Sequence, residues 1–167
     1  MTSAEKLAGG IDAFVDFVGR ATSWLALGLA LVMGANVLMR YAFSYGFIWA
    51  QELEWHIFIP ICLFGMSYAL RHGEHVRVDV LFQYFTPRNK HRVEVIAALI
   101  SMAFCVIVIW LSIPWVYQSW SIGEGTANPG GIDYRYIVKA LIPIGFAILF
   151  LQSLSEAIKN TIAMRSA

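Results

Sequence analysis

Three ionisable side chains interrupt an apolar stretch of the sequence, FIWAQELEWHIFIP at residues 47–60. Glu52, Glu54 and His56 are residue types that relay protons, bind metals or pair with charges on a neighbouring helix. Because Glu52 and His56 are four residues apart, they share one face of a helix, whereas Glu54 points in a different direction. A compact site in which two carboxylates act as acid and base is therefore disfavoured.

A metal or haem site at Glu52 and His56 lacks ligands. Zinc sites usually take three or four ligands from the protein, and the pair supplies two. The remaining histidines are expected on the other side of a membrane: His72, His75 and His91. We therefore expect no cofactor and no metal, and we interpret His56 as a packed, hydrogen-bonded histidine.

The chain that carries these residues is too apolar for an ordinary soluble domain. Of its 167 residues, 59% are hydrophobic and 14% are charged, and the mean hydropathy is +0.64. About 20 apolar residues are needed for a helix to cross a bilayer. Four segments reach that length: 22–43, 49–70, 93–117 and 136–154. We expect an all-α integral membrane protein, residues 1–167 forming one membrane domain with four transmembrane helices.

Basic residues predict how the chain is oriented. Of the 12 Lys and Arg residues, all but Arg40, Arg135 and Lys139 lie before the first span, between the second and third spans, or in the tail. Cytoplasmic segments carry the excess of Lys and Arg. Both termini and the 71–92 connector are therefore expected in the cytoplasm, and the 118–135 connector in the periplasm.

Two segments are expected to lie along the cytoplasmic membrane surface. Residues 1–21 place apolar side chains at helical spacing between acidic ones, so they form an interfacial helical segment or extend the first helix. An apolar run at 80–85 is too short to span, and it predicts a position among the headgroups, with Arg77 and Arg88 near lipid phosphates.

The dipeptide Thr86-Pro87 predicts where the third helix begins. Threonine is a common N-cap, and proline suits the first turn because its missing amide hydrogen would be unpaired there anyway. A helix from Pro87 to about Trp120 would be roughly 50 Å long, which is more than the bilayer core requires. The connector that follows contains Asn128-Pro129-Gly130, a strong turn signal.

Polar and small side chains in the first two spans are candidates for pairing helices. Because only a short connector separates these spans, Arg40 and Glu52 are expected near each other, and an ion pair would offset the cost of either charge beside hydrocarbon. The candidates for helix pairing or for a subunit interface are Asn36, Arg40, Trp49, Glu52 and His56. A stripe of small residues that lets another helix approach closely is formed by Ala26, Ala30 and Gly34.

Four stretches of the chain resemble the small, DctQ-type membrane subunit of tripartite ATP-independent periplasmic (TRAP) transporters. They are NVLMRYAF, WAQELEW, GMSYALRHGEHVRVDVL and LIPIGFAILFLQ. The resemblance covers nearly the whole chain. Its most specific part is the cytoplasmic motif of Gly65, Arg71, His75 and Asp79.

The resemblance implies a subunit of a secondary transporter in the bacterial inner membrane. In that family a periplasmic binding protein delivers the solute, commonly an organic acid, to a large permease subunit that is commonly coupled to sodium. The large subunit carries the substrate and ion sites. The small subunit is similar to an added scaffold, so the expected partners are the large permease, the binding protein and membrane phospholipids, with no nucleic acid and no enzymatic activity.

The residues themselves leave two other classes open. One is a small exporter that works as a dimer around a membrane carboxylate and is driven by protons. The other is a membrane anchor subunit of a redox complex. The acidic residues cluster near a helix end and the membrane histidine is isolated, so both classes are disfavoured.

The predicted orientation can be tested with single cysteines in a background that lacks Cys62 and Cys105. Because Asn89 is expected in the cytoplasm and Thr126 in the periplasm, an impermeant thiol reagent applied to intact cells should label Thr126→Cys and leave Asn89→Cys unlabelled. Labelling of Asn89→Cys alone would reverse the topology. Permeabilised cells provide the control for reactivity.

Overall fold

The computed structural model describes residues 3–74 and 84–166, and all regular structure in these residues is helical. The helices are α1 (Ser3–Phe43), α2 (Ile48–His72), α4 (Pro87–Ser121) and α5 (Arg135–Ser166). Each is long and apolar enough to cross a membrane. The expected all-α membrane architecture with four spanning helices is confirmed.

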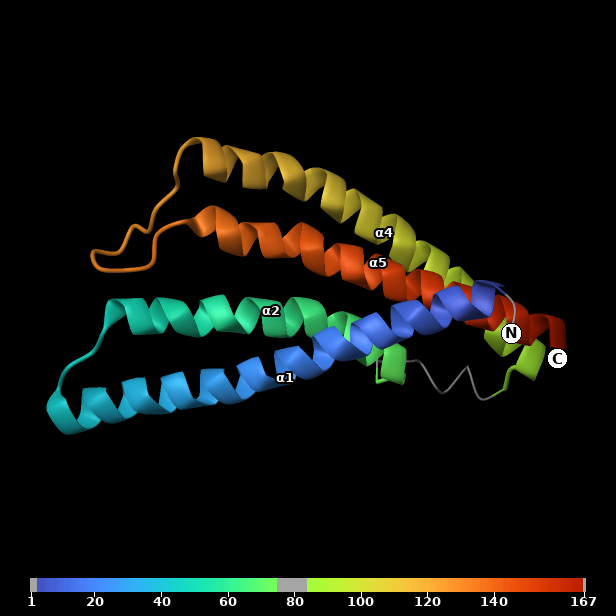
Figure 1. Ribbon diagram of the computed structural model, residues 1–167, viewed down its shortest axis with the longest axis horizontal. Coiled ribbons are helices and arrows are strands. Elements are labelled where there is room, and N and C mark those ends of the chain that lie inside the picture. Colours follow the sequence, from blue (N-terminus) through green and yellow to red (C-terminus); the bar gives the residue numbers. More distant parts are fainter. Residues whose placement is uncertain (1–2, 75–83, 167) are drawn as a thin grey trace.

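The helices are splayed rather than closed into a compact bundle (Figure 1). They converge at the end that holds both termini and spread apart toward the other end, where the α1–α2 turn and the α4–α5 connector lie. α5 is central, because it packs on α4, α2 and α1, while α1 also packs on α2. α5 therefore holds α4 to the rest of the molecule.

Local signals set the helix ends. Thr86 caps α4, since its hydroxyl accepts a hydrogen bond from the amide of Asn89 at 3.4 Å, and Pro87 occupies the first turn. The predicted start of this helix is confirmed. At the end of α2, Gly73 adopts the left-handed conformation with φ of 72° and its amide bonds back to the last turn.

Each of the four predicted spans lies within one helix, but the helices are longer than the spans. α1 contains 41 residues, so it is roughly 61 Å long, about twice the thickness of the hydrocarbon core. It is uninterrupted from Ser3, so residues 3–21 extend the first helix. Where the membrane surface meets each helix stays a prediction. The apolar run expected among the headgroups falls mostly in residues 75–83, outside the described residues.

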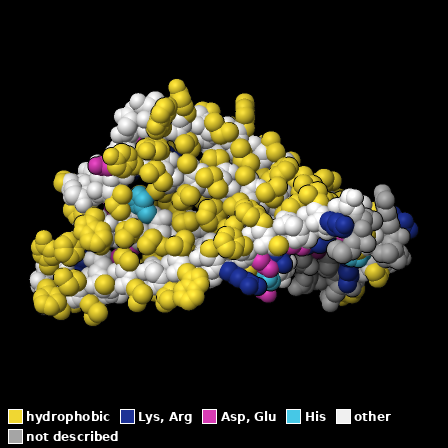
Figure 2. All heavy atoms as spheres, viewed as in Figure 1, with side chains coloured by type: hydrophobic (Ala, Val, Ile, Leu, Met, Phe, Trp, Pro, Cys, Tyr) yellow, Lys and Arg dark blue, Asp and Glu magenta, His cyan; other side chains and the backbone are white. Residues whose placement is uncertain are grey.

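The interior of the described chain is more polar than its surface. The buried hydrophobic residues are Ala8, Val15, Ala50, Ala98, Cys105 and Ile148. The buried polar or charged residues are Thr22, Asn36, Glu52, Ser67, Ser112, Ser119, Gln152, Ser153 and Ser155. Hydrophobic side chains instead cover much of the visible surface (Figure 2). Helices in lipid associate in this way, because apolar side chains gain nothing by leaving hydrocarbon, whereas small and polar ones allow close packing and hydrogen bonding.

Two carboxylates of α1 tie this helix to its neighbours near the termini. Asp12 accepts hydrogen bonds from Ser155 at 2.7 Å and from Lys159 at 3.1 Å, both on α5. Asp16 pairs with Arg71 of α2 at 2.7 Å. These contacts join three helices at the end of the molecule where they converge.

The crossing of α1 and α2 depends on a glycine, and two matched substitutions test it. A Cβ on Gly19 would lie 2.0 Å from the ring of Tyr68, whereas a Cβ on Gly28, also in α1, would meet no atom within 4 Å. Gly19→Ala should therefore lower the free energy of unfolding by about 1–3 kcal/mol through overpacking, and Gly28→Ala should be neutral or slightly stabilising. Reversible unfolding in mixed micelles provides the measurement. Equal effects of the two substitutions would contradict the close crossing.

Candidate functional site

The carboxylate of Glu52 is the centre of a polar cluster at the connector end of the described chain. Glu52 lies near the start of α2 and is 3% exposed. One carboxylate oxygen, Oε1, accepts hydrogen bonds from the hydroxyl of Thr126 at 2.5 Å and from the side-chain amide of Asn128 at 2.9 Å. The other oxygen, Oε2, accepts from the backbone amide of Ile132 at 2.6 Å. The guanidinium of Arg135 lies 3.7 Å from Oε1.

The connector that supplies these donors, residues 122–134, wraps closely around the carboxylate. The amide of Gly131 bonds to the carbonyl of Asn128 at 3.0 Å, and Gly130 has a positive φ of 80°. A Cβ on Gly131 would lie 2.5 Å from Oε2 of Glu52. Glycine at this position therefore lets the backbone approach near enough for the amide of Ile132 to donate its hydrogen bond.

The described structure does not contain the expected ion pair between Arg40 and Glu52. Glu52 faces the connector and α5, where Arg135 supplies the positive charge, and Arg40 is exposed on α1. The side of α2 that faces α1 presents Glu54, which accepts a hydrogen bond from Asn36 at 2.9 Å. The pairing was wrong because it assumed which side of α2 faces α1. The separate directions of Glu52 and Glu54 are as expected.

The other candidates on α2 are placed as follows. Nδ1 of His56 is 2.5 Å from the backbone carbonyl of Glu52, and its ring centroid is 4.2 Å from that of Trp55. Trp49 is 49% exposed, with its ring 5.7 Å from that of Phe47. Among the described residues, no group of three or more His, Cys, Asp or Glu side chains could hold a metal ion.

The small-residue stripe and the cytoplasmic motif lie away from this cluster. Ala26, Ala30 and Gly34 are all exposed on α1, and a Cβ on Gly34 would meet no atom within 4 Å. The role of the stripe in contacting a partner stays a prediction. Arg71 forms the ion pair with Asp16 described above. The two other charged residues of the motif, His75 and Asp79, lie outside the described residues.

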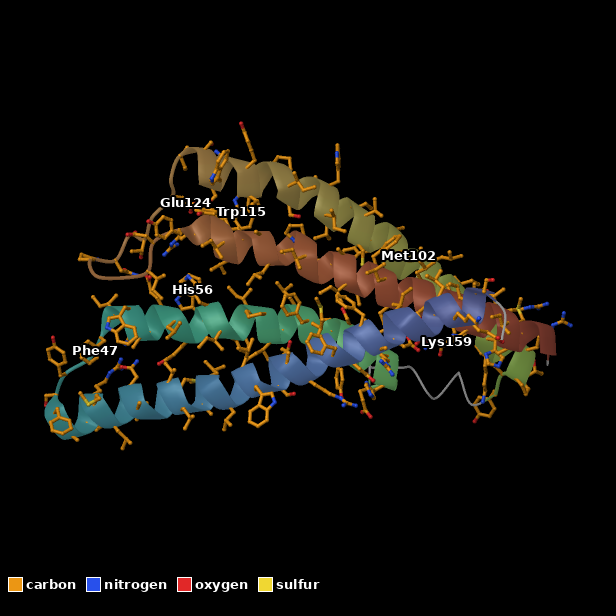
Figure 3. All side chains as sticks on the ribbon, in the orientation of Figure 1. Phe47, His56, Met102, Trp115, Glu124 and Lys159 are labelled. Carbon is orange, nitrogen blue, oxygen red and sulfur yellow. The ribbon has the colours of Figure 1, made fainter. Side chains whose placement is uncertain are left out.

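A second ion pair closes the connector against α5 beside Glu52. Lys139 donates a hydrogen bond to Glu124, and its ammonium lies 4.3 Å from the centroid of the Trp115 ring. Figure 3 shows Trp115 and Glu124 together where the connector leaves α4, with His56 across from them on α2. The hydrogen bond from Lys139 lowers the pKa of Glu124. The pair therefore stabilises the connector at pH values above the ordinary pKa of a glutamate. This stabilisation is lost as the pH falls through the lowered pKa of Glu124.

Sequence reasoning missed the residues that surround Glu52. Thr126, Asn128 and Ile132 are 74 to 80 positions away from Glu52 in the chain. The turn signal at Asn128-Pro129-Gly130 indicated a tight loop, but nothing in its spacing indicated which carboxylate it would surround. Because both oxygens of Glu52 are occupied by fixed donors, the cluster is suited to holding helices and connector in place.

Comparison with known proteins identifies the group of proteins that this chain resembles over most of its length. Residues 29–162 match the family described as tripartite ATP-independent periplasmic transporters, DctQ component. The chain is 27% identical over 139 residues to the ectoine TRAP transporter small permease protein TeaB of Halomonas elongata, covering 81% of this chain and 71% of TeaB.

Two further relatives carry TRAP transporter names. The C4-dicarboxylate TRAP transporter small permease protein DctQ of Vibrio cholerae is 26% identical over 151 residues, covering 77% of this chain and 64% of that protein. The sialic acid TRAP transporter permease protein SiaT of Haemophilus influenzae is 24% identical over 141 residues. The latter match covers 81% of this chain but 22% of SiaT.

The Glu52 cluster predicts different effects for two neighbouring glutamates. Glu52→Gln keeps the size of the side chain but removes its charge and one acceptor, so the amide of Ile132 should exchange its hydrogen about tenfold faster or more. Glu54→Gln is the matched control, because Glu54 contacts Asn36 and not the connector. Amide hydrogen exchange read by mass spectrometry on peptides covering 122–134 provides the measurement. Unchanged exchange in Glu52→Gln would rule out this anchoring role.

Proposed function

The chain belongs to the DctQ family of small permease subunits of TRAP transporters, and from this premise we propose that it is a non-catalytic scaffold that braces a large permease subunit. As a member of this family it is a multi-pass protein of the bacterial inner membrane and not an enzyme. We place both termini in the cytoplasm and the α4–α5 connector in the periplasm, which follows from the distribution of basic residues.

The main support for the scaffold role is the burial and the hydrogen bonding of Glu52. Among the described residues it is the only charged side chain that is buried, and its two oxygens accept three hydrogen bonds from the connector of the same chain. A carboxylate that moves ions or protons must exchange its partners during the cycle. Glu52 is instead enclosed by donors of the connector and lies beside Arg135 of α5, which supports a role in assembly and counts against the proton-driven exporter.

The surface of the chain supports assembly with another membrane protein. Large apolar side chains are exposed along α1 and α4, including Leu31 and Leu38 on α1 and Ile100 and Trp110 on α4. Such a surface is stable only against lipid or another apolar protein surface. The splayed arrangement gives the chain a broad footprint in the bilayer, as a scaffold requires (Figure 1).

The relationship to SiaT supports a large permease as the partner. SiaT is named as a permease protein, and the part of it that is similar to this chain makes up 22% of its length. A segment of this kind therefore occurs in one polypeptide with a much larger remainder. We propose that the present chain is a separate subunit that binds a large permease subunit.

The solute and its delivery are part of the proposal. Two of the three relatives described above are named for acids, C4-dicarboxylate and sialic acid. We propose that the complete transporter imports an organic acid delivered by a periplasmic binding protein, with import driven by a sodium gradient. In this arrangement the substrate and ion sites belong to the large subunit.

Purification and reconstitution test the scaffold role. The chain should copurify in stoichiometric amounts with a large permease subunit expressed in the same cells. Vesicles that contain both subunits should take up a labelled organic acid when the binding protein and a sodium gradient are supplied. Vesicles that contain this chain alone, prepared at the same protein density, should show no uptake. Ion-dependent uptake by the chain alone would overturn the proposal.

A further inference from the structure

A groove lies between α2 and α4 at the connector end of the molecule, with α5 as its floor. Its volume is about 570 Å³. α2 contributes Trp55, Phe58 and Leu63 to one wall, and α4 contributes Trp115 to the other. The groove exists because α2 and α4 both pack on α5 and diverge toward this end (Figure 1).

The mouth of the groove is lined by charged side chains and its depth is apolar. Arg135, Lys139 and Glu124 line the end near the connector, whereas the lining deeper in the membrane is apolar, as at Ile59 and Ile142. Lys139 is engaged by Glu124 and by the ring of Trp115. Arg135 lies 3.7 Å from Glu52, so each of the two cations at the mouth has a carboxylate beside it.

Arg135 supplies the donors at this mouth that remain available. Its Nη2 atom lies 3.4 Å from the hydroxyl of Thr126, and its charge lies 3.7 Å from Glu52. Both of these contacts use Nη2, and the Nε atom is buried among protein atoms, so Nη1 is the donor that faces a ligand. Because a guanidinium carries five N–H donors, a phosphate at the mouth would accept hydrogen bonds from Nη1 without displacing the contacts of Nη2.

The polarity of the groove matches the outer part of one membrane leaflet. The guanidinium of Arg135 lies 5.6 Å from the ring centroid of Trp55, and the ammonium of Lys139 lies over Trp115. Tryptophan is enriched where the headgroups meet the hydrocarbon. The charged mouth is therefore at the level of lipid phosphates, and the apolar depth is at the level of acyl chains.

We propose that this groove binds one membrane phospholipid, with its phosphate at Arg135 and an acyl chain along α5 between α2 and α4. The length of the groove favours this occupant over a transmembrane helix of a partner. Its α2 wall runs from Trp55 to Leu63, roughly 12 Å. It ends where α2 and α5 approach closely at Leu63 and Gly145. A spanning helix needs about 30 Å of surface, whereas the upper part of an acyl chain fits a short, closed groove.

A bound lipid would fill the space that α5 alone leaves between α2 and α4. The phosphate would join Arg135, which already contacts the Glu52 cluster, and the acyl chain would contact all three helices. This site is independent of the proposed scaffold role and makes the lipid an integral part of the subunit.

Native mass spectrometry of the full chain and of its complex with the large permease tests this site. The chain in detergent should retain one phospholipid, and Arg135→Gln should weaken retention about tenfold because it removes a charge-assisted contact. Arg135→Lys should restore part of it. Arg40→Gln is the matched control, since it removes an exposed cation that does not line the groove. Equal retention by Arg135→Gln and Arg40→Gln would overturn the proposal.

A second measurement separates lipid binding from loosening of the connector. Cys62 lines the groove and is exposed, whereas Cys105 is buried. In delipidated protein, phosphatidylglycerol in micelles should slow the reaction of Cys62 with N-ethylmaleimide, and inorganic phosphate should not. Val138→Trp, which adds bulk to the groove and keeps Arg135 and Lys139, should abolish this protection while circular dichroism and the Ile132 exchange rate stay normal.

Three results of these two measurements would count against the lipid site. Protection by inorganic phosphate alone would show that no acyl chain is needed. Protection that persists in Val138→Trp would place the lipid elsewhere. Displacement of the lipid when the large permease binds would assign the groove to the interface between the subunits.

Discussion

A buried carboxylate must be surrounded by donors, and this requirement organises the connector end of the molecule. Glu52 meets it with the hydroxyl of Thr126, the amide of Asn128 and the backbone of Ile132, with Arg135 supplying positive charge. Satisfying one charge therefore fixes the rotation of α2, the path of the connector and the start of α5. The close approach at Gly131 is a consequence of the same requirement.

The remaining contacts follow from the bilayer acting as the solvent. Apolar side chains gain little by packing together in lipid, so small and polar residues determine where the helices meet. Near the termini, Asp12 and Asp16 join α1 to α5 and α2. At the other end, Glu52 joins α2 to the connector and α5. With polar contacts at both ends and α5 in the centre, the helices can spread apart without losing their relative positions.

This construction suits a subunit that supports another protein. The carboxylates of Asp12, Asp16 and Glu52 hold elements together, and large apolar side chains lie on the surface. Membership of the DctQ family agrees with this division, because the family consists of small permease subunits of transporters. In the groove beside α5, a lipid would complete contacts that the four helices do not make among themselves.

The sequence by itself determined the four helices, the start of α4 at Pro87 and the family, because each depends on local composition, capping or a continuous motif. Helical periodicity also showed that Glu52 and Glu54 point in different directions. It did not show which neighbour each side of α2 would meet, so Arg40 was assigned to Glu52 in place of Arg135. That choice depends on the rotation of α2 about its axis and on a connector more than 70 residues away folding back onto it. Only the tertiary structure decided it, because a buried charge selects its partners by position in space and not by distance along the chain.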